Sequence, residues 1–220
     1  MSFEKILRVL VALGGLVVLA VIGARFYIFH PYRIPSGGMI PTYQVDAHVV
    51  ANHLERGPER GKVIVFPFPE NETQDFIQRI IGVGDDRVRV VGGHPRINDW
   101  EVPSCDVGKY VSIDGNVIHH YEIFVEFLGR SAYLVAIDAL LGDSKAEASW
   151  TVKPGHVFTM GDNRMNSYDS RLWPSQTGVD VDSIKDGFEP TVTPTLPSDA
   201  SALKSALDAC LTKRPQKTSP

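Results

Sequence analysis

Three short segments hold the residue types from which a catalytic site could be built. Residues 35–42 read PSGGMIPT and offer the hydroxyl of Ser36 beside two glycines. Residues 76–82 read FIQRIIG, and residues 155–171 read GHVFTMGDNRMNSYDSR. A serine hydroxyl becomes a nucleophile when a neighbouring base takes its proton. The charged third segment alone is also typical of a solvated loop, so order and spacing must decide whether the three segments form one site.

That order and spacing resemble the bacterial type I signal peptidases. Residues 35–42 are similar to the family's nucleophile motif, Pro-Ser-x-Ser-Met-x-Pro-Thr. Residues 76–82 resemble its second catalytic segment, in which a lysine precedes the arginine. Residues 161–171 keep every fixed position of its most distinctive block, Gly-Asp-Asn-Arg-x-x-Ser-x-Asp-Ser-Arg. The resemblance covers about residues 30–187 and implies a serine endopeptidase site that uses a serine and a lysine.

Both reacting positions of that site are substituted in this chain. The position of the family's nucleophilic serine is Gly38, and the position of its general-base lysine is Gln78. Glycine has no group that attacks a carbonyl, and a glutamine amide is not a base near neutral pH. Loss of a serine protease nucleophile costs on the order of 10⁶ in turnover. The sequence therefore predicts a family member that does not cleave its substrate.

Ser36 is the obvious candidate to replace the missing nucleophile. Residues two apart in an extended segment face the same side, but they lie about 6.6 Å apart. Catalytic contacts tolerate a displacement of roughly 1 Å, so we do not expect Ser36 to take over. A histidine could also replace the missing base, as it does in some relatives that the resemblance points to, but position 78 is not a histidine. We expect the histidines at other positions, His48, His53 and His156, to lie in turns or at the surface.

The remaining roles are those that the resemblance implies. Ser36 matches the hydroxyl that assists the oxyanion, and Ser167 matches the serine that orients the base. Charged pairs, Arg79 with Asp162 and Asp169 with Arg171, are expected to stiffen the site. No cofactor and no metal is expected. The other framework positions of the third motif are Asn163, Arg164 and Ser170.

The N-terminus carries an unbroken apolar run, Val9–Ala24. Sixteen residues are marginal for about 30 Å of hydrocarbon at about 1.5 Å per residue, but apolar and aromatic residues extend the run on both sides. A cleaved signal peptide is the rival interpretation. The segment Ile22-Gly23-Ala24 makes a poor cleavage site because it begins with a bulky residue, so residues 1–30 are predicted to be an uncleaved membrane anchor.

Short β-like runs separated by turns follow the anchor and predict a mainly β domain over residues 31–187. The resemblance implies the family's coiled β-sheet fold. Residues 188–220 are predicted to form a Pro/Thr/Ser linker and a short amphipathic segment, with a helix over Ser198–Leu211. The expected strands are 48–51, 63–66, 76–81, 87–91, 117–127 and 133–137, with hairpin turns at Gly92-Gly93 and Asp114-Gly115.

Composition excludes some partners and leaves one covalent question open. The formal net charge is −4 and there is no basic stripe, so nucleic acid is not an expected partner. The two cysteines, Cys105 and Cys210, are too few for a disulfide framework. They form either one bond or two independent thiols.

Three functions are compatible with these observations. The first is a non-catalytic signal peptidase family member in the bacterial inner membrane, single-pass, with its domain on the extracytoplasmic side. It would contact lipid through its helix and bind signal-peptide-bearing preproteins or modulate an active paralogue. The second is an active signal peptidase I of which this chain is an inactivated variant, and the third is a structural role at the membrane. An intact paralogue in the same genome would favour the first.

Overall fold

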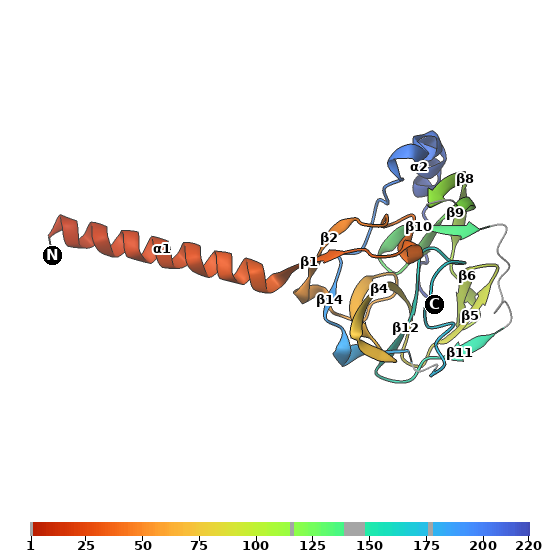
Figure 1. The fold of residues 1–220 in the computed structure, drawn as a ribbon, viewed down its shortest axis with the longest axis horizontal. Helices are drawn as coiled ribbons and strands as arrows, with labels where there is room; N and C mark the ends of the chain where they lie inside the picture. The colour runs from red at the N-terminus through yellow and green to blue at the C-terminus, as the bar shows by residue number, and fades with distance from the viewer. Residues whose placement is uncertain (1, 115–116, 139–147, 176–177) are drawn as a thin grey trace.

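A computed structural model describes residues 2–114, 117–138, 148–175 and 178–220 of the chain (Figure 1). One long helix projects from a body of antiparallel β-sheets, and a short helix near the C-terminus lies against that body. The prediction of a mainly β fold with one N-terminal apolar helix is therefore confirmed.

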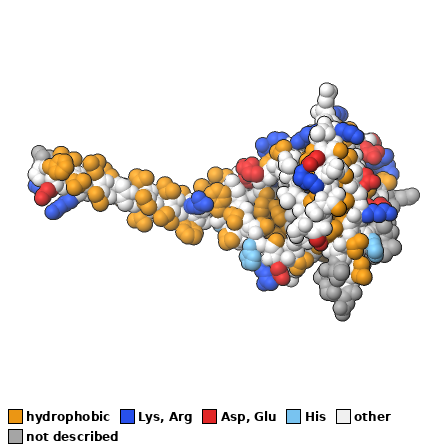
Figure 2. All heavy atoms as spheres, turned by 90° about the horizontal axis from the view of Figure 1, so that it is seen from above, with side chains coloured by type: hydrophobic (Ala, Val, Ile, Leu, Met, Phe, Trp, Pro, Cys, Tyr) orange, Lys and Arg blue, Asp and Glu red, His pale blue; other side chains and the backbone are white. Residues whose placement is uncertain are grey.

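The projecting helix α1 (Phe3–Ile28) contains 26 residues. Its length is about 39 Å at about 1.5 Å per residue, which exceeds the hydrocarbon thickness of a bilayer. Hydrophobic side chains cover it, as Figure 2 shows, and its most apolar stretch buries nothing against the body. Within the described ranges it is the one helix long and apolar enough to cross a membrane.

The largest sheet carries the first two sequence motifs. Its seven strands are antiparallel to their neighbours, and β3 and β4 form a long hairpin near its centre. The third motif begins where β12 ends, next to β4. In spatial order the strands are β1 (Phe29–Arg33), β2 (His48–Asn52), β14 (Asp186–Gly187), β3 (Val63–Phe68), β4 (Asn71–Val83), β12 (His156–Met160) and β13 (Val179–Asp180).

Two smaller sheets complete the body. Gly92 and Gly93 join β5 to β6 with φ of 56° and 84°, which confirms the predicted glycine turn because a left-handed backbone favours glycine. The predicted turn at Asp114-Gly115 falls partly outside the described residues. One sheet contains β10 (Ser131–Asp138), β9 (Val117–Leu128) and β8 (Ser104–Asp114), and the other contains β11 (Ser149–Thr151), β5 (Arg87–Val91), β6 (His94–Ile97) and β7 (Trp100–Glu101).

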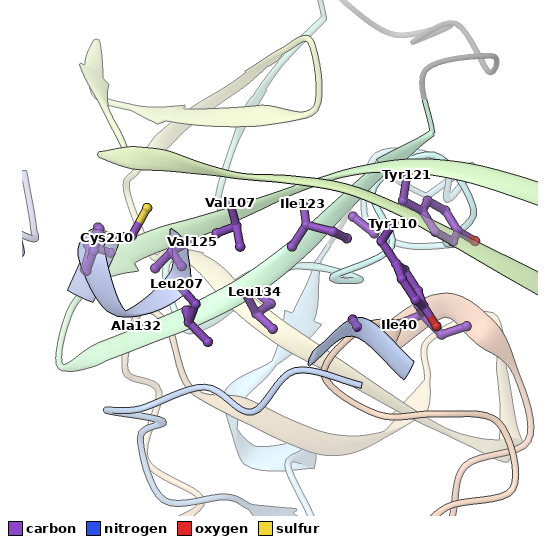
Figure 3. Close-up of a cluster of buried hydrophobic side chains, with 13 residues drawn as sticks. Ile40, Val107, Tyr110, Tyr121, Ile123, Val125, Ala132, Leu134, Leu207 and Cys210 are labelled. Atoms are coloured by element: carbon purple, nitrogen blue, oxygen red, sulfur yellow. The ribbon is translucent and has the colours of Figure 1, made fainter. Parts of the chain in front are cut away.

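The C-terminal segment packs on the body. The predicted helix is present as a 3₁₀ turn, η4 (Ser198–Leu203), followed by α2 (Lys204–Thr212). Leu207 is buried in a hydrophobic cluster with strand residues of the β8–β10 sheet (Figure 3). Cys210 forms a disulfide with Cys105 across a sequence separation of 105 residues, which resolves the question of one bond or two thiols.

Candidate active site

The four positions expected to do the chemistry line one cavity of about 1080 Å³. Ser36 and Gly38 come from the turn after β1, Gln78 comes from β4, and Ser167 comes from the loop after β12. The structure thus brings together residues that are up to 131 positions apart in the chain. Other lining residues are Tyr32, Asp75, Phe76, Met165, Tyr168 and Leu172.

Gly38 occupies a short 3₁₀ turn, η1 (Gly37–Met39), that the third motif holds in place. The backbone N–H of Asn163 donates to the Gly38 carbonyl at 3.0 Å. The Asn163 side-chain amide donates to the Gly37 carbonyl at 3.1 Å. Because Asn163 fixes two successive carbonyls, it positions the backbone of residue 38 within the site.

The turn does not require glycine at position 38. The φ of Gly38 lies outside the left-handed region, and a Cβ atom there would meet its nearest neighbour, the Ser167 Oγ, at 3.6 Å, an ordinary contact. Gly161 is different because a Cβ atom there would lie 2.2 Å from the same Oγ and 2.4 Å from the Gly38 carbonyl oxygen. Gly161 is therefore needed for close packing, whereas Gly38 leaves room for a side chain.

Gln78 is buried, and the nitrogen and the oxygen of its side-chain amide each have a hydrogen-bond partner. Its Nε2 donates to the Tyr168 carbonyl at 2.9 Å, and its Oε1 accepts from the Thr159 hydroxyl at 2.8 Å. The Thr159 backbone N–H in turn donates to the Ser170 hydroxyl at 3.0 Å. Both polar atoms of the buried amide therefore have a partner, as is usual for buried polar groups. The sequence did not reveal Thr159 or Tyr168 as partners, because neither spacing nor type marks a residue that meets position 78.

The predicted pairing of Arg79 with Asp162 is confirmed. Two parallel hydrogen bonds of 2.8 and 2.6 Å join the guanidinium to the carboxylate, and both side chains are buried. The third guanidinium nitrogen donates to the Gly61 carbonyl at 2.7 Å. Burial alone would lower the pKa of Arg79, but the Asp162 charge outweighs it and raises that pKa. This pair locks β4 to the start of the third motif.

The predicted pairing of Asp169 with Arg171 is confirmed as well. Arg171 donates to both carboxylate oxygens at 2.8 and 2.9 Å, and Asp169 also accepts from the Gly161 backbone N–H at 3.0 Å. Arg171 reaches back to the Arg164 carbonyl at 2.7 Å. The block is therefore a buried framework, and the interpretation as a solvated charged loop is wrong.

Glu126 is a structural residue that the sequence interpretation missed. It forms two hydrogen bonds of 2.8 and 2.6 Å with Arg164, both side chains being fully buried. The Tyr133 hydroxyl donates to the same carboxylate at 2.9 Å. Burial raises the pKa of Glu126, but the Arg164 charge outweighs it and lowers that pKa to about 2. A carboxylate inside the apolar run FVEFL was the available signal.

We expect Glu126 to make the stability of the chain fall at acid pH. Its folded-state pKa of about 2 lies below the ordinary 4.5, so its contribution is complete above about pH 4.5 and is lost as pH falls toward 2. The contribution is about 3 kcal/mol, since one pKa unit corresponds to about 1.4 kcal/mol. Urea unfolding of the chain and of Glu126→Gln should show a stability gap that narrows between pH 5 and pH 3. A gap that is constant with pH would contradict this assignment.

Comparisons with known proteins agree with the resemblance seen in the motifs. The family described as signal peptidase, peptidase S26, matches residues 6–186. Signal peptidase I of Aquifex aeolicus is 31% identical over 239 aligned positions, which cover 92% of this chain and 93% of the relative. Signal peptidase I of Pseudomonas aeruginosa is 29% identical over 172 aligned positions, which cover 71% of this chain and 60% of the relative.

The chain thus spans about 60% of the length of the Pseudomonas relatives that it matches. A crystal structure of a signal peptidase I from Enterococcus faecalis V583 is 20% identical and superposes with a TM-score of 0.36, covering 60% of this chain and 97% of that one.

Proposed function

The chain belongs to the signal peptidase family, peptidase S26, and we propose that it is a membrane-anchored member that binds the signal-peptide region of exported preproteins without cleaving it. The observation that carries this proposal is the occupancy of the two reacting positions. Gly38 and Gln78 both face the cavity that the family motifs enclose. The cavity therefore keeps its walls and its backbone framework but has neither the family's nucleophile nor its base.

The described residues that line the cavity offer no replacement for the missing base. Among the described residues that line it there is no lysine and no histidine. The carboxylate of Asp75, the one acidic group among those described lining residues, is paired with the Lys185 ammonium at 2.7 Å. Ser36 lines the cavity, but a hydroxyl without a base stays a poor nucleophile near neutral pH. Ser36 keeps the expected role of assisting the oxyanion, and Ser167 keeps the expected role of orienting the residue at position 78.

The cavity is large enough for an extended peptide, and the family resemblance implies small side chains on that peptide. Its volume of about 1080 Å³ is at the upper end of ordinary ligand sites. Its lining includes the β4 segment from Gln74 to Gln78 and the segment from Tyr32 to Met39. A peptide that lies between them as an added strand would gain main-chain hydrogen bonds, and shallow apolar contacts would select its side chains. We assign the preprotein cleavage region to this groove.

The location follows from two features. α1 is apolar over a length that exceeds a bilayer core, which supports a single-pass anchor in the bacterial inner membrane. The body holds a disulfide between Cys105 and Cys210, and disulfides persist in oxidising compartments outside the cytoplasm. We therefore place the β body on the extracytoplasmic side, where exported preproteins emerge. An active paralogue that this chain modulates stays a further expected partner.

Peptide binding by the full chain in detergent micelles tests the proposal. We expect a labelled signal peptide with alanine at the first and third positions before the cleavage point to bind at least tenfold more tightly than one with bulky residues there. Fluorescence anisotropy measures both. Gly38→Leu should weaken binding by at least tenfold because position 38 lines the cavity, so a bulky side chain there would take up space that the peptide needs. Gly57→Leu is the matched control, since open space surrounds Gly57. Equal binding of both peptides, or no effect of Gly38→Leu, would contradict the proposal.

A further inference from the structure

A second cluster of chemically capable side chains lies where the helix α1 meets the body. Asp186 of β14 is 1% exposed. Two histidines, His30 and His53, both contact the same carboxylate oxygen of Asp186. The Nδ1 atoms of His30 and His53 lie 2.9 and 3.2 Å from its Oδ1. His53 belongs to a 3₁₀ turn, η2 (His53–Glu55), and is partly buried. His53 thus lies in a turn, as expected, and in addition contacts a buried carboxylate.

We propose that this cluster binds one divalent transition metal ion of the zinc class, with His30, His53 and Asp186 as its ligands. Their donor atoms all lie within 4.8 Å of one another. Ligands of a tetrahedral zinc ion at about 2.0–2.1 Å are about 3.4 Å apart. The two observed separations from the carboxylate oxygen are within about half an ångström of that spacing. The donor atoms of the two histidines also lie within 4.8 Å of each other, so rotation of the His30 and His53 side chains would bring all three donors around one ion.

The chemistry of the donors selects the class of metal. Two imidazole nitrogens and one carboxylate oxygen suit zinc, whereas magnesium and calcium prefer oxygen ligands alone. Three protein ligands leave a fourth position for water. The hydroxyl of Tyr32 donates to the other carboxylate oxygen of Asp186, and such a partner fixes the orientation of a ligating carboxylate.

The position of the cluster indicates what the ion would do. The two histidine ligands are 156 and 133 residues away from Asp186 in the sequence. The three ligands come from β1, from the turn after β2, and from β14. The strands β1, β2 and β14 are neighbours at one edge of the largest sheet. The His53 ring also packs edge-on against Tyr27, near the end of α1, with 5.4 Å between ring centroids. The ion would therefore fasten the base of the anchor to the sheet.

Tyr32 links the proposed metal site to the peptide cavity. Tyr32 contacts Asp186 through its hydroxyl and lines the cavity. It lies in β1, the strand that leads directly into Ser36 and Gly38. The proposed role is structural, and it holds whether or not the chain cleaves or binds preproteins.

Metal titration of the full chain in detergent micelles tests this site. After removal of metals with a chelator, calorimetric titration with Zn²⁺ should show one ion per chain with a dissociation constant at or below about 1 μM. His30→Gln and His53→Gln should each weaken binding by at least tenfold, and a variant that fails the circular-dichroism check for folding is set aside in favour of the other. Co²⁺ in place of Zn²⁺ should give the visible bands of a tetrahedral nitrogen and oxygen site.

His119→Gln is the matched control, because His119 also faces a carboxylate, Asp138, at 3.2 Å. It should bind zinc as tightly as the unmodified chain. The proposal is overturned if the unmodified chain binds no ion at 100-fold excess, if both folded histidine variants bind as tightly as the control, or if the Co²⁺ spectrum is octahedral.

Discussion

The chain carrying both Gly38→Ser and Gln78→Lys is expected to release mature protein from a detergent-solubilised preprotein, at least about 10³-fold faster than either single variant. A lone serine has no base and a lone lysine has no nucleophile to activate, so the two act as a unit and their effects do not add. The structure leaves room for the new serine, because a Cβ atom at position 38 meets its nearest neighbour at 3.6 Å. Its hydroxyl would lie beside Ser167.

The surroundings of position 78 also suit the new lysine. Position 78 is 5% exposed, so burial would lower the pKa of the lysine and favour its neutral form. The Thr159 hydroxyl and the Tyr168 carbonyl, which now bind the glutamine amide, would remain as hydrogen-bond partners. Gly57→Ser with Gln216→Lys adds the same groups at exposed positions and should stay inactive. A folded repaired chain that leaves the preprotein intact would show that more than the two reacting groups has been lost.

Asp162→Ala is expected to destabilise the chain by about 3–5 kcal/mol. The substitution leaves the Arg79 guanidinium buried without its counter-charge, and an unpaired buried charge costs far more than the loss of an exposed pair. It also removes an acceptor of the Thr42 hydroxyl, which ties the turn after β1 to the same carboxylate. The measurement is urea unfolding of the full chain in micelles, followed by circular dichroism.

Asp208→Ala is the control for that experiment. Asp208 pairs with Lys204 on the surface of α2, and both side chains are more than half exposed. Exposed pairs of this type contribute about 0.3–0.5 kcal/mol. If the two aspartate variants lose similar stability, Asp162 does not hold the framework in the way its contacts indicate.

Local sequence patterns were enough to place most of the β-structure. The run at 87–91 is a strand with those same bounds, and the run at 76–81 lies inside the longer β4. The amphipathic spacing after residue 198 is a 3₁₀ turn and a helix, with Leu207 buried as its face requires. These predictions succeeded because alternation and helical spacing are properties of neighbouring residues. The division of the chain after residue 187 stays a prediction, although the tail shares a hydrophobic cluster with β8 and β9.

Long-range polar partners could not be predicted in the same way. The Arg79–Asp162 pair was accessible only because both residues lie in motifs that the family resemblance had joined. Glu126 and Arg164 are 38 residues apart, and the His30–Asp186 contact spans 156. Which strand lies beside which is set by the packing of the whole sheet. A residue's type and spacing therefore cannot identify a partner from a distant strand.

The most direct test of the central claim is a time course in which the unmodified chain is mixed with a preprotein and both binding and cleavage are followed. Cross-linking should report the complex, and mass spectrometry should show the preprotein intact at every time point. The Ser36→Ala variant should give the same mass-spectrometry result, with the preprotein intact at every time point. Release of mature protein by the unmodified chain, abolished by Ser36→Ala, would contradict the account, because it would show that a second serine has taken over the reaction.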